Sequence, residues 1–409
     1  MLEQRKVVVI GAGPSGAIAA TLLKRQGYDV LVLEKQTFPR FSIGESLLPH
    51  CLDFIEEAGM LAAVEAQGYQ IKHGAAFALD QQYSVFDFAK QFTQDSKKYA
   101  YEVKRGEFDK LLADCAVEQG VEIRYQHEIV DIVFQDDLAF LTVNDLSTGK
   151  QYQLQTEFVL DGSGYGRVLA RLLNLETPSN LPPRQAIFTH IEDNITAPQF
   201  ERDKILISVH PQHQDIWFWL IPFSDGRSSI GVVGEPHYFA SFDDDFAACL
   251  QSFVKTTPNL TALLGEAKWD TAYQKLTGYS ANVKQLYGKN FALLGNSAEF
   301  LDPVFSSGVT IAMCSASLAV KALDRQFKGE QVDWQRDFAD VLQRGVDTFR
   351  TYVMGWYDLS FQRAIFAENR NDKISAMISS ILAGYAWDLE NPYVKEHQRR
   401  LKTLAELCK

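Results

Sequence analysis

The sequence has few cysteines, no long apolar run and no excess of basic residues. Its five cysteines form no C-x-x-C pair, so neither a disulfide framework nor a zinc site is predicted, and free thiols suit a reducing cytoplasm. The absence of a run of about 18 apolar residues argues against a membrane span. Lysine and arginine number 40 against 52 aspartates and glutamates, and the net charge of −12 argues against nucleic acid as a partner.

The length and the first residues limit how the chain is organised. At 409 residues it is too long for a single compact core, so two or three domains are expected. The chain leads almost directly into the apolar run Val7 to Ile10, so we expect no signal peptide and a cytoplasmic location.

A glycine-rich turn follows that apolar run. Four β-branched residues in succession predict a strand buried on both faces, and residues 14–26 predict a helix. The turn between them reads Gly11, Ala12, Gly13, Pro14, Ser15 and Gly16. In a G-x-G-x-x-G turn the glycines allow a tight bend, a close approach to a pyrophosphate, and close packing of helix on strand.

The next apolar strand ends in Glu34 and Lys35, 23 and 24 positions after Gly11. A carboxylate at this place can accept hydrogen bonds from ribose hydroxyls. Three glycines alone also occur in ordinary structural turns, but the strand, the helix and the distal acid together favour a dinucleotide site. The motif does not say which dinucleotide binds.

Three later stretches complete a family pattern: Val103-Lys104-Arg105-Gly106-Glu107-Phe108-Asp109, Asp161-Gly162-Ser163-Gly164, and Leu294-Gly295-Asn296-Ser297 through Asp302-Pro303. With the opening glycines they resemble the FAD-binding fold of the hydroxylase and geranylgeranyl-reductase type. The resemblance implies FAD, with its ADP half on the opening glycines and its isoalloxazine near Asp302. It also implies cofactor contacts from Arg40, Ser46, Arg105, Asp161, Asp302, Gly308 and Val309. Arg105 has the alternative of a helix-cap or surface ion-pair arginine, and the role of Arg40 stays open.

The predicted fold class is α/β: a Rossmann-like FAD domain of hydroxylase type, an inserted and mostly antiparallel sheet for substrate, and a helical tail. We assign the FAD domain to residues 1–68, 104–170 and 276–330. The substrate sheet is assigned to 69–103 and 171–275, and the helical tail to 331–409.

A tryptophan pair narrows the resemblance to the flavin-dependent halogenases. Trp217-Phe218-Trp219-Leu220-Ile221-Pro222 matches the W-x-W-x-I-P signature of the tryptophan-halogenase-like group. Two positions apart on a strand, Trp217 and Trp219 share one face and form an apolar wall that suits separation of flavin from substrate. The alternative is a pair of core tryptophans.

Lys72 stands in Lys72-His73-Gly74-Ala75, which resembles the K-x-G-A segment that carries the essential lysine of the halogenases. The resemblance implies that Lys72 guides or carries a hypohalous species beside the aromatic carbon. Burial would lower the pKa of its amine. The alternative is a solvated surface lysine, and His73, on the opposite face of the strand, is expected to be structural.

The segment from Asp302 to Val309 reads D-P-V-F-S-S-G-V and resembles halogenases of phenols and pyrroles. Tryptophan halogenases carry a glutamate at the place of Phe305, which speaks against free tryptophan as substrate. The resemblance puts Phe305, Ser306 and Ser307 beside the halide or the substrate, and an ordinary helix start is the alternative. A helix beginning here would offer N–H groups to the flavin.

The expected activity is FAD-dependent halogenation of an electron-rich aromatic, of phenol or pyrrole type, either free or carried on an acyl or peptidyl carrier protein. The resemblance implies oxygen, chloride or bromide, and reduced FAD from a separate reductase. A hydroxylase or a geranylgeranyl-reductase-like dehydrogenase of the same fold is the alternative. A third possibility is a flavin-binding protein that docks on a carrier protein without turnover.

Overall fold

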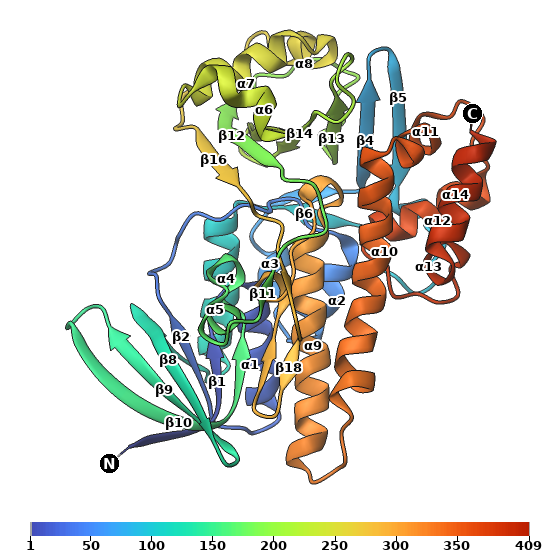
Figure 1. Cartoon of the computed structure of the whole chain (residues 1–409). Helices are drawn as coiled ribbons and strands as arrows, with labels where there is room; N and C mark the ends of the chain where they lie inside the picture. The colour runs from blue at the N-terminus through green and yellow to red at the C-terminus, as the bar shows by residue number, and fades with distance from the viewer. Residues whose placement is uncertain (1, 409) are drawn as a thin grey trace.

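The computed structural model describes residues 2–408, in which two large sheets stand one above the other with helices around them (Figure 1). The first sheet has the order β18-β19-β10-β1-β2-β7, and its neighbours run parallel except for β18. Its strands are β1 (Glu3–Ile10), β2 (Val30–Glu34), β7 (Glu122–Tyr125), β10 (Lys150–Asp161), β18 (Tyr287–Gly288) and β19 (Phe291–Leu293). The α/β prediction is confirmed.

The central strand β1 is buried on both faces because alternate residues meet different layers. Val7 and Val9 belong to the main core, whereas Val8 and Ile10 belong to a second core with the antiparallel strands that extend β10. Those strands are β8 (His127–Gln135) and β9 (Leu138–Asp145). The helices of the main core include α1 (Pro14–Arg25), α2 (Pro49–Glu57), α3 (Leu61–Glu65), α4 (Arg105–Glu118) and α9 (Ser307–Phe327), while α5 (Val168–Leu172) lies against the second core.

The second sheet has the order β16-β12-β15-β14-β13-β4-β5, and β13–β4 is its parallel pair. Its strands are β4 (Gly74–Leu79), β5 (Gln82–Asp87), β12 (Gln185–Glu192), β13 (Lys204–Val209), β14 (Trp217–Pro222), β15 (Arg227–Gly234) and β16 (Gln274–Thr277). One face packs on α6 (Pro236–Phe239), α7 (Phe246–Lys255) and α8 (Pro258–Leu263) (Figure 1). The opposite face carries Trp217 and Trp219 and joins the main core.

Two short strand pairs form where the chain passes from one large sheet to the other. β3 (Gln70–Lys72) pairs with β6 (Ala100–Glu102), and β11 (Glu176–Thr177) pairs with β17 (Asn282–Val283). The first pair places Lys72 near the loop at Ser46, because Ser46 bridges to Glu102.

Residues 340–408 form five α-helices that cover one side of the molecule and carry aromatic residues into the main core (Figure 1). They are α10 (Asp340–Tyr357), α11 (Ser360–Phe366), α12 (Asp372–Leu382), α13 (Pro392–Lys395) and α14 (His397–Leu407). Helix α10 packs along α9, and α11 packs on β4 and β5, so the tail closes the edge of the second sheet. Among residues 2–408, no helix is both long and apolar enough to cross a bilayer.

Candidate functional site

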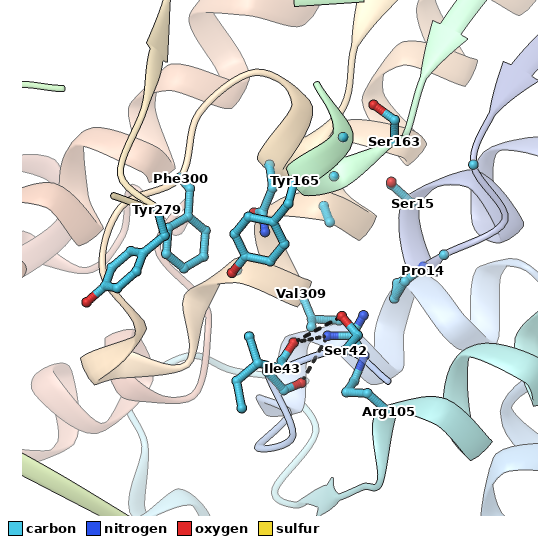
Figure 2. A pocket seen from close by; sticks show the side chains of 18 of the residues that line it. Pro14, Ser15, Ser42, Ile43, Arg105, Ser163, Tyr165, Tyr279, Phe300 and Val309 are labelled. Atoms are coloured by element: carbon cyan, nitrogen blue, oxygen red, sulfur yellow. Dashed lines mark hydrogen bonds between the residues drawn. The ribbon is translucent and has the colours of Figure 1, made fainter. Parts of the chain in front are cut away.

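A cavity of about 630 Å³ extends between the two sheets, from the glycine turn after β1 to the tryptophans of β14. This volume lies within the range of about 300–1,000 Å³ that is typical of small-molecule and cofactor sites. Figure 2 shows the wall near the turn, where Pro14 and Ser15 lie on one side and Tyr165, Tyr279 and Phe300 on the other.

The glycine turn is held by contacts that only glycine allows. Gly11 has φ +87°, and a Cβ on it would lie 2.8 Å from the carbonyl oxygen of Gly162. A Cβ on Gly16 would lie 1.9 Å from the carbonyl oxygen of Gly11. Gly13, Pro14 and Ser15 line the cavity, so bare backbone and the start of α1 face its interior, as phosphate binding requires.

Glu34 lies in the cavity wall at the buried end of β2. Its Oε2 accepts the N–H of Ala12 at 2.8 Å and its Oε1 accepts the N–H of Gln36 at 2.9 Å. Both oxygens are therefore fixed by backbone donors while spare lone pairs remain for ribose hydroxyls. Lys35 also lies in the wall, and its Nζ is 2.7 Å from Glu128.

Two arginines share one buried carboxylate beside the glycine turn. Asp109 is fully buried, and its oxygens accept Arg105 Nε at 2.8 Å, Arg105 Nη2 at 3.1 Å and Arg40 Nη1 at 3.0 Å. Arg105 Nη1 also donates to the carbonyl of Ile43 at 2.7 Å (Figure 2). Arg105 is thus a buried arginine and not a surface one. The cluster carries one net positive charge in the cavity wall, which suits a phosphate.

Asp161 and Asp302 lie behind the wall and shape the turns that form it. Asp161 accepts the N–H groups of Ser163 at 2.9 Å and Leu169 at 2.7 Å, and burial raises the pKa of its carboxyl. Asp302 accepts the N–H of Val304 at 3.1 Å and the hydroxyl of Tyr357 at 2.8 Å. Burial raises the pKa of Asp302 to about 6, against the lowering effect of the Tyr357 hydrogen bond.

The start of α9 reaches the cavity through part of the predicted segment. Ser306, in the left-handed region at φ +56°, lines the wall together with Gly308 and Val309. Ser307 is buried outside the wall. Phe305 is also buried, with its ring edge-on to the rings of Trp356 and Phe361. The 21-residue helix therefore presents its N-terminus to the cavity, whereas Phe305 fills the core behind it.

Trp217 and Trp219 form the far wall, with ring centroids 6.0 Å apart. Trp217 Nε1 donates to the hydroxyl of Tyr357 and Trp219 Nε1 donates to Oγ of Ser229, both at 3.0 Å. Because each indole N–H is satisfied on the side away from the cavity, the rings can offer apolar surface in fixed orientations. Phe188 and several aliphatic side chains complete this chamber.

Lys72 is 1% exposed, so the alternative of a solvated surface lysine is wrong. Its Nζ donates to Oγ of Ser46 at 2.7 Å and to the carbonyl of Leu47 at 2.9 Å. Burial lowers the pKa of the amine, against the opposing charge of Glu102. Ser46 lines the cavity and Lys72 does not. The Ser46 hydroxyl therefore lies between the Lys72 ammonium and the cavity. His73 is exposed and lies 3.2 Å from Asp203.

Several residues at this site carry no sequence signal. Tyr165 lies in the short 3-10 helix Gly164–Gly166, and Tyr279 and Phe300 lie outside the helices and strands, so no periodicity marks an inward side chain (Figure 2). His190 on β12 reaches Glu45 from 145 positions along the chain. Glu45 stands in the recognisable G-E-S-L segment, but its partner could not be read from the sequence.

Comparison with known proteins agrees with this geometry. Residues 4–339 match the family model described as an FAD binding domain. A 1H-pyrrole-2-carbonyl-[peptidyl-carrier protein] chlorinase of Pseudomonas fluorescens is 26% identical over 98% of this chain and 93% of its own length. A tryptophan 2-halogenase of Chondromyces crocatus is 33% identical over 80% of this chain, which spans 62% of that relative. A crystal structure of a flavoprotein/dehydrogenase from Cytophaga hutchinsonii is 41% identical, with 99% of both chains covered and a TM-score of 0.95.

The chain belongs to the FAD-binding family, in the group that contains the flavin-dependent halogenases. It is an FAD-dependent enzyme, as predicted. The site fits this cofactor, since the turn at Gly11 and Gly13 leaves backbone open to a pyrophosphate, Glu34 suits a ribose, and the cavity continues to the N-terminus of α9.

Proposed function

We propose that this chain halogenates an electron-rich aromatic of phenol or pyrrole type. The observation that carries the proposal is the single cavity shared by three parts: the glycine turn, the wall of Trp217 and Trp219, and Ser46 backed by the Lys72 ammonium. An FAD site alone would suit many oxidoreductases. The proposal therefore rests on the buried lysine that lies at a hydroxyl of the same cavity.

In this proposal the glycine turn, Glu34 and the Arg40–Asp109–Arg105 cluster hold the ADP half of FAD, and the N-terminus of α9 faces the flavin. Bound reduced FAD would supply two electrons to oxygen and the halide two more, so that one oxygen atom leaves as water and the other forms the hypohalous acid. The turns held by Asp161 and Asp302 keep the wall rigid, so that the reacting groups are aligned before chemistry begins.

Ser46 and Lys72 act together on the hypohalous acid. The Lys72 ammonium donates to the Ser46 hydroxyl, and in this proposal the hydroxyl proton of Ser46 turns toward the cavity that Ser46 lines. A hydroxyl polarised by a cation is a strong donor, so it holds the oxygen of the hypohalous acid and makes its halogen more electrophilic. The tryptophan wall encloses this species, so that it reaches the ring before it diffuses into solvent.

The proposed substrate class and partners are supported by the relatives and by the residue at position 305. The Pseudomonas relative acts on a pyrrole held by a peptidyl carrier protein. Phe305 fills the core at the place where tryptophan halogenases carry a glutamate, which favours a phenol or pyrrole over free tryptophan. We propose a substrate that is either free or carrier-bound, a chloride or bromide ion, and a separate flavin reductase as partners.

A dehydrogenase of the same fold is the second candidate. It is favoured by the 41% identity to the Cytophaga hutchinsonii flavoprotein/dehydrogenase over nearly the whole chain. In that reaction Lys72 would have no hypohalous acid to guide, so its replacement would leave turnover largely intact.

Replacement of Lys72 distinguishes the halogenase from the dehydrogenase. The wild type, Lys72→Ala and the exposed control Lys90→Ala are supplied with reduced FAD, oxygen, bromide and a panel of phenols and pyrroles. We expect brominated product from the wild type and Lys90→Ala and none from Lys72→Ala, which should still bind FAD. Retained bromination in Lys72→Ala would remove Lys72 from the mechanism.

A further inference from the structure

Glu45 is a buried residue of the cavity wall, and one of its carboxylate oxygens has no hydrogen-bond partner among the described residues. It is 1% exposed, and its Oε1 lies 2.6 Å from Nε2 of His190. Within residues 2–408, its Oε2 is buried and has no hydrogen-bond partner. Leaving such an acceptor unpaired costs about 1–3 kcal/mol, and unpaired buried polar atoms are rare enough to require an explanation.

The position of Glu45 is fixed on both sides along the chain. The carbonyl of the preceding Gly44 accepts Arg105 Nη1 at 3.2 Å, and the following Ser46 is held by Lys72. The carbonyl of Glu45 itself accepts the N–H of Val103 at 2.7 Å. These contacts hold the main chain at Glu45 in place, and the side chain is held by His190.

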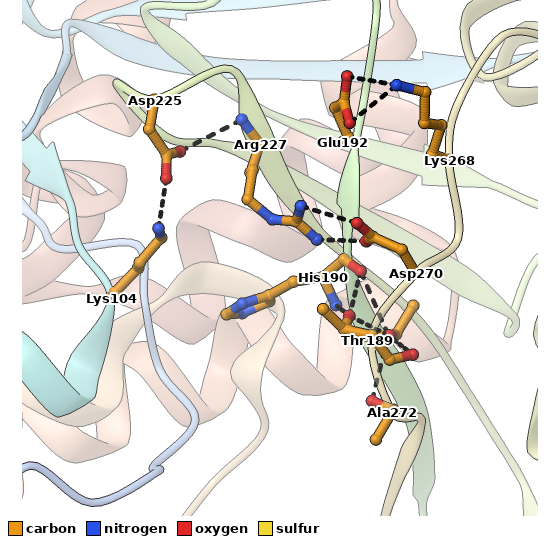
Figure 3. Close-up of polar contacts among 10 residues, drawn as sticks. Lys104, Thr189, His190, Glu192, Asp225, Arg227, Lys268, Asp270 and Ala272 are labelled. Carbon is orange, nitrogen blue, oxygen red and sulfur yellow. Dashed lines mark hydrogen bonds and ion pairs between the residues drawn. The ribbon is translucent and has the colours of Figure 1, made fainter.

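Other charges near His190 are already engaged with one another. Lys104 pairs with Asp225 at 2.5 Å and Arg227 pairs with Asp270 at 2.6 Å, and Figure 3 shows both contacts. The His190 ring points away from the polar contacts around Thr189 in that view, and packs edge-on against Phe223. These pairs leave His190 as the fixed partner of Glu45.

Among the described residues of the wall, three are acidic: Glu34, Glu45 and Glu128. Glu34 has a backbone donor on each oxygen, and Glu128 pairs with Lys35. Glu45 alone combines full burial with a free carboxylate oxygen. Ser46, one residue away, is the hydroxyl that the Lys72 ammonium polarises.

We propose that the free oxygen of Glu45 accepts a hydrogen bond from the O–H or N–H of the aromatic substrate, and that His190 positions Glu45 for this contact. The inference rests on the proposed function and names the feature by which the site selects its substrate. Phenols and pyrroles both carry such a donor next to a nucleophilic ring. A carboxylate that accepts this hydrogen bond raises the electron density of the ring. One contact therefore orients the substrate and activates it toward the electrophilic halogen.

Binding to the protein loaded with oxidised FAD tests this without turnover. Calorimetry compares phenol with anisole, and pyrrole with N-methylpyrrole. A hydrogen bond to a charged acceptor contributes about 1.5–3 kcal/mol, so the wild type should prefer the donor-bearing ligand by about 10- to 150-fold. Glu45→Gln, which keeps only a neutral acceptor, should reduce that preference to a few-fold.

Two further comparisons separate positioning from folding. Glu192→Gln on the same strand as His190, where the side chain pairs with Lys268 at the surface, should keep the wild-type preference. His190→Leu should lose most of it, whereas His190→Gln should restore it because the amide can still donate to Glu45. Equal FAD content in all variants shows that each has folded.

The outcomes are distinct. An unchanged preference in Glu45→Gln, or no preference in the wild type, overturns the inference even if halogenated product is found. If the preference depends on Glu45 but no halogenated product forms, the recognition of the donor stands and the proposed reaction fails.

Discussion

Glu102 offers a direct test of the electrostatics around Lys72. It lies on β6 and is 1% exposed. Burial raises its pKa from an ordinary 4.5 to about 7, although the Lys72 ammonium and the Ser46 hydroxyl oppose this rise. Replacing Glu102 with Gln keeps the shape of the side chain and removes its ionisation.

The direction of the pH dependence follows from linkage. The folded protein binds the Glu102 proton more tightly than the unfolded chain, so wild-type stability falls as the pH rises from about 4.5 through about 7. The full shift corresponds to a cost on the order of 3 kcal/mol above about pH 7, and roughly half of that is already present at about pH 5.5. Glu102→Gln does not bear this cost.

Urea unfolding of the wild type and Glu102→Gln at about pH 5.5 and about pH 8 measures the effect. The free energy of unfolding of Glu102→Gln, relative to the wild type, should rise by about 2 kcal/mol between the two pH values. Glu118→Gln, on the exposed face of α4, should show no such change. If the difference in the free energy of unfolding between Glu102→Gln and the wild type is the same at both pH values, or changes in the opposite direction, the pKa of Glu102 is not raised by folding.

Three further substitutions test other parts of the site. Gly16→Ala would place a Cβ 1.9 Å from the Gly11 carbonyl oxygen, so we expect loss of FAD from the purified protein, measured by its absorbance. Asp109→Asn removes the carboxylate that pairs with the buried Arg105 and the half-buried Arg40, and urea unfolding should show a loss of about 3–5 kcal/mol. Tyr357→Phe removes a hydrogen bond that lowers the pKa of Asp302. That pKa, followed by carboxyl-labelled NMR, should therefore rise above about 6, and an unchanged value would contradict the assignment.

The first sheet and its glycine turn could be predicted because their signals are local. Buried β-branched residues before Gly11, and an acid at the end of the next strand, are each read within a few positions. The tryptophan pair is equally local, since two residues that are two apart on a strand share a face. The groups that accept the two indole N–H hydrogen bonds, Ser229 and Tyr357, lie 10 and 140 positions away in the sequence.

The remaining features of the site depend on contacts between distant segments. His190 meets Glu45 because β12 is folded over the loop before α2, and Glu102 reaches the neighbourhood of Lys72 because β6 pairs with β3. Neither pairing has a periodic or motif signal. Lys72 itself was predicted as a functional residue, but its location behind Ser46 depends on the burial of a whole strand pair and could not be foreseen.

The mass spectrum of the product shows whether this cavity halogenates an aromatic ring. Wild-type protein is given reduced FAD, oxygen and a phenol or pyrrole, once with bromide and once without halide. We expect a product with the isotope doublet of bromine at the mass of the substrate with one hydrogen replaced by bromine, and only in the presence of bromide. A product that is hydroxylated or dehydrogenated alike in both reactions would contradict it.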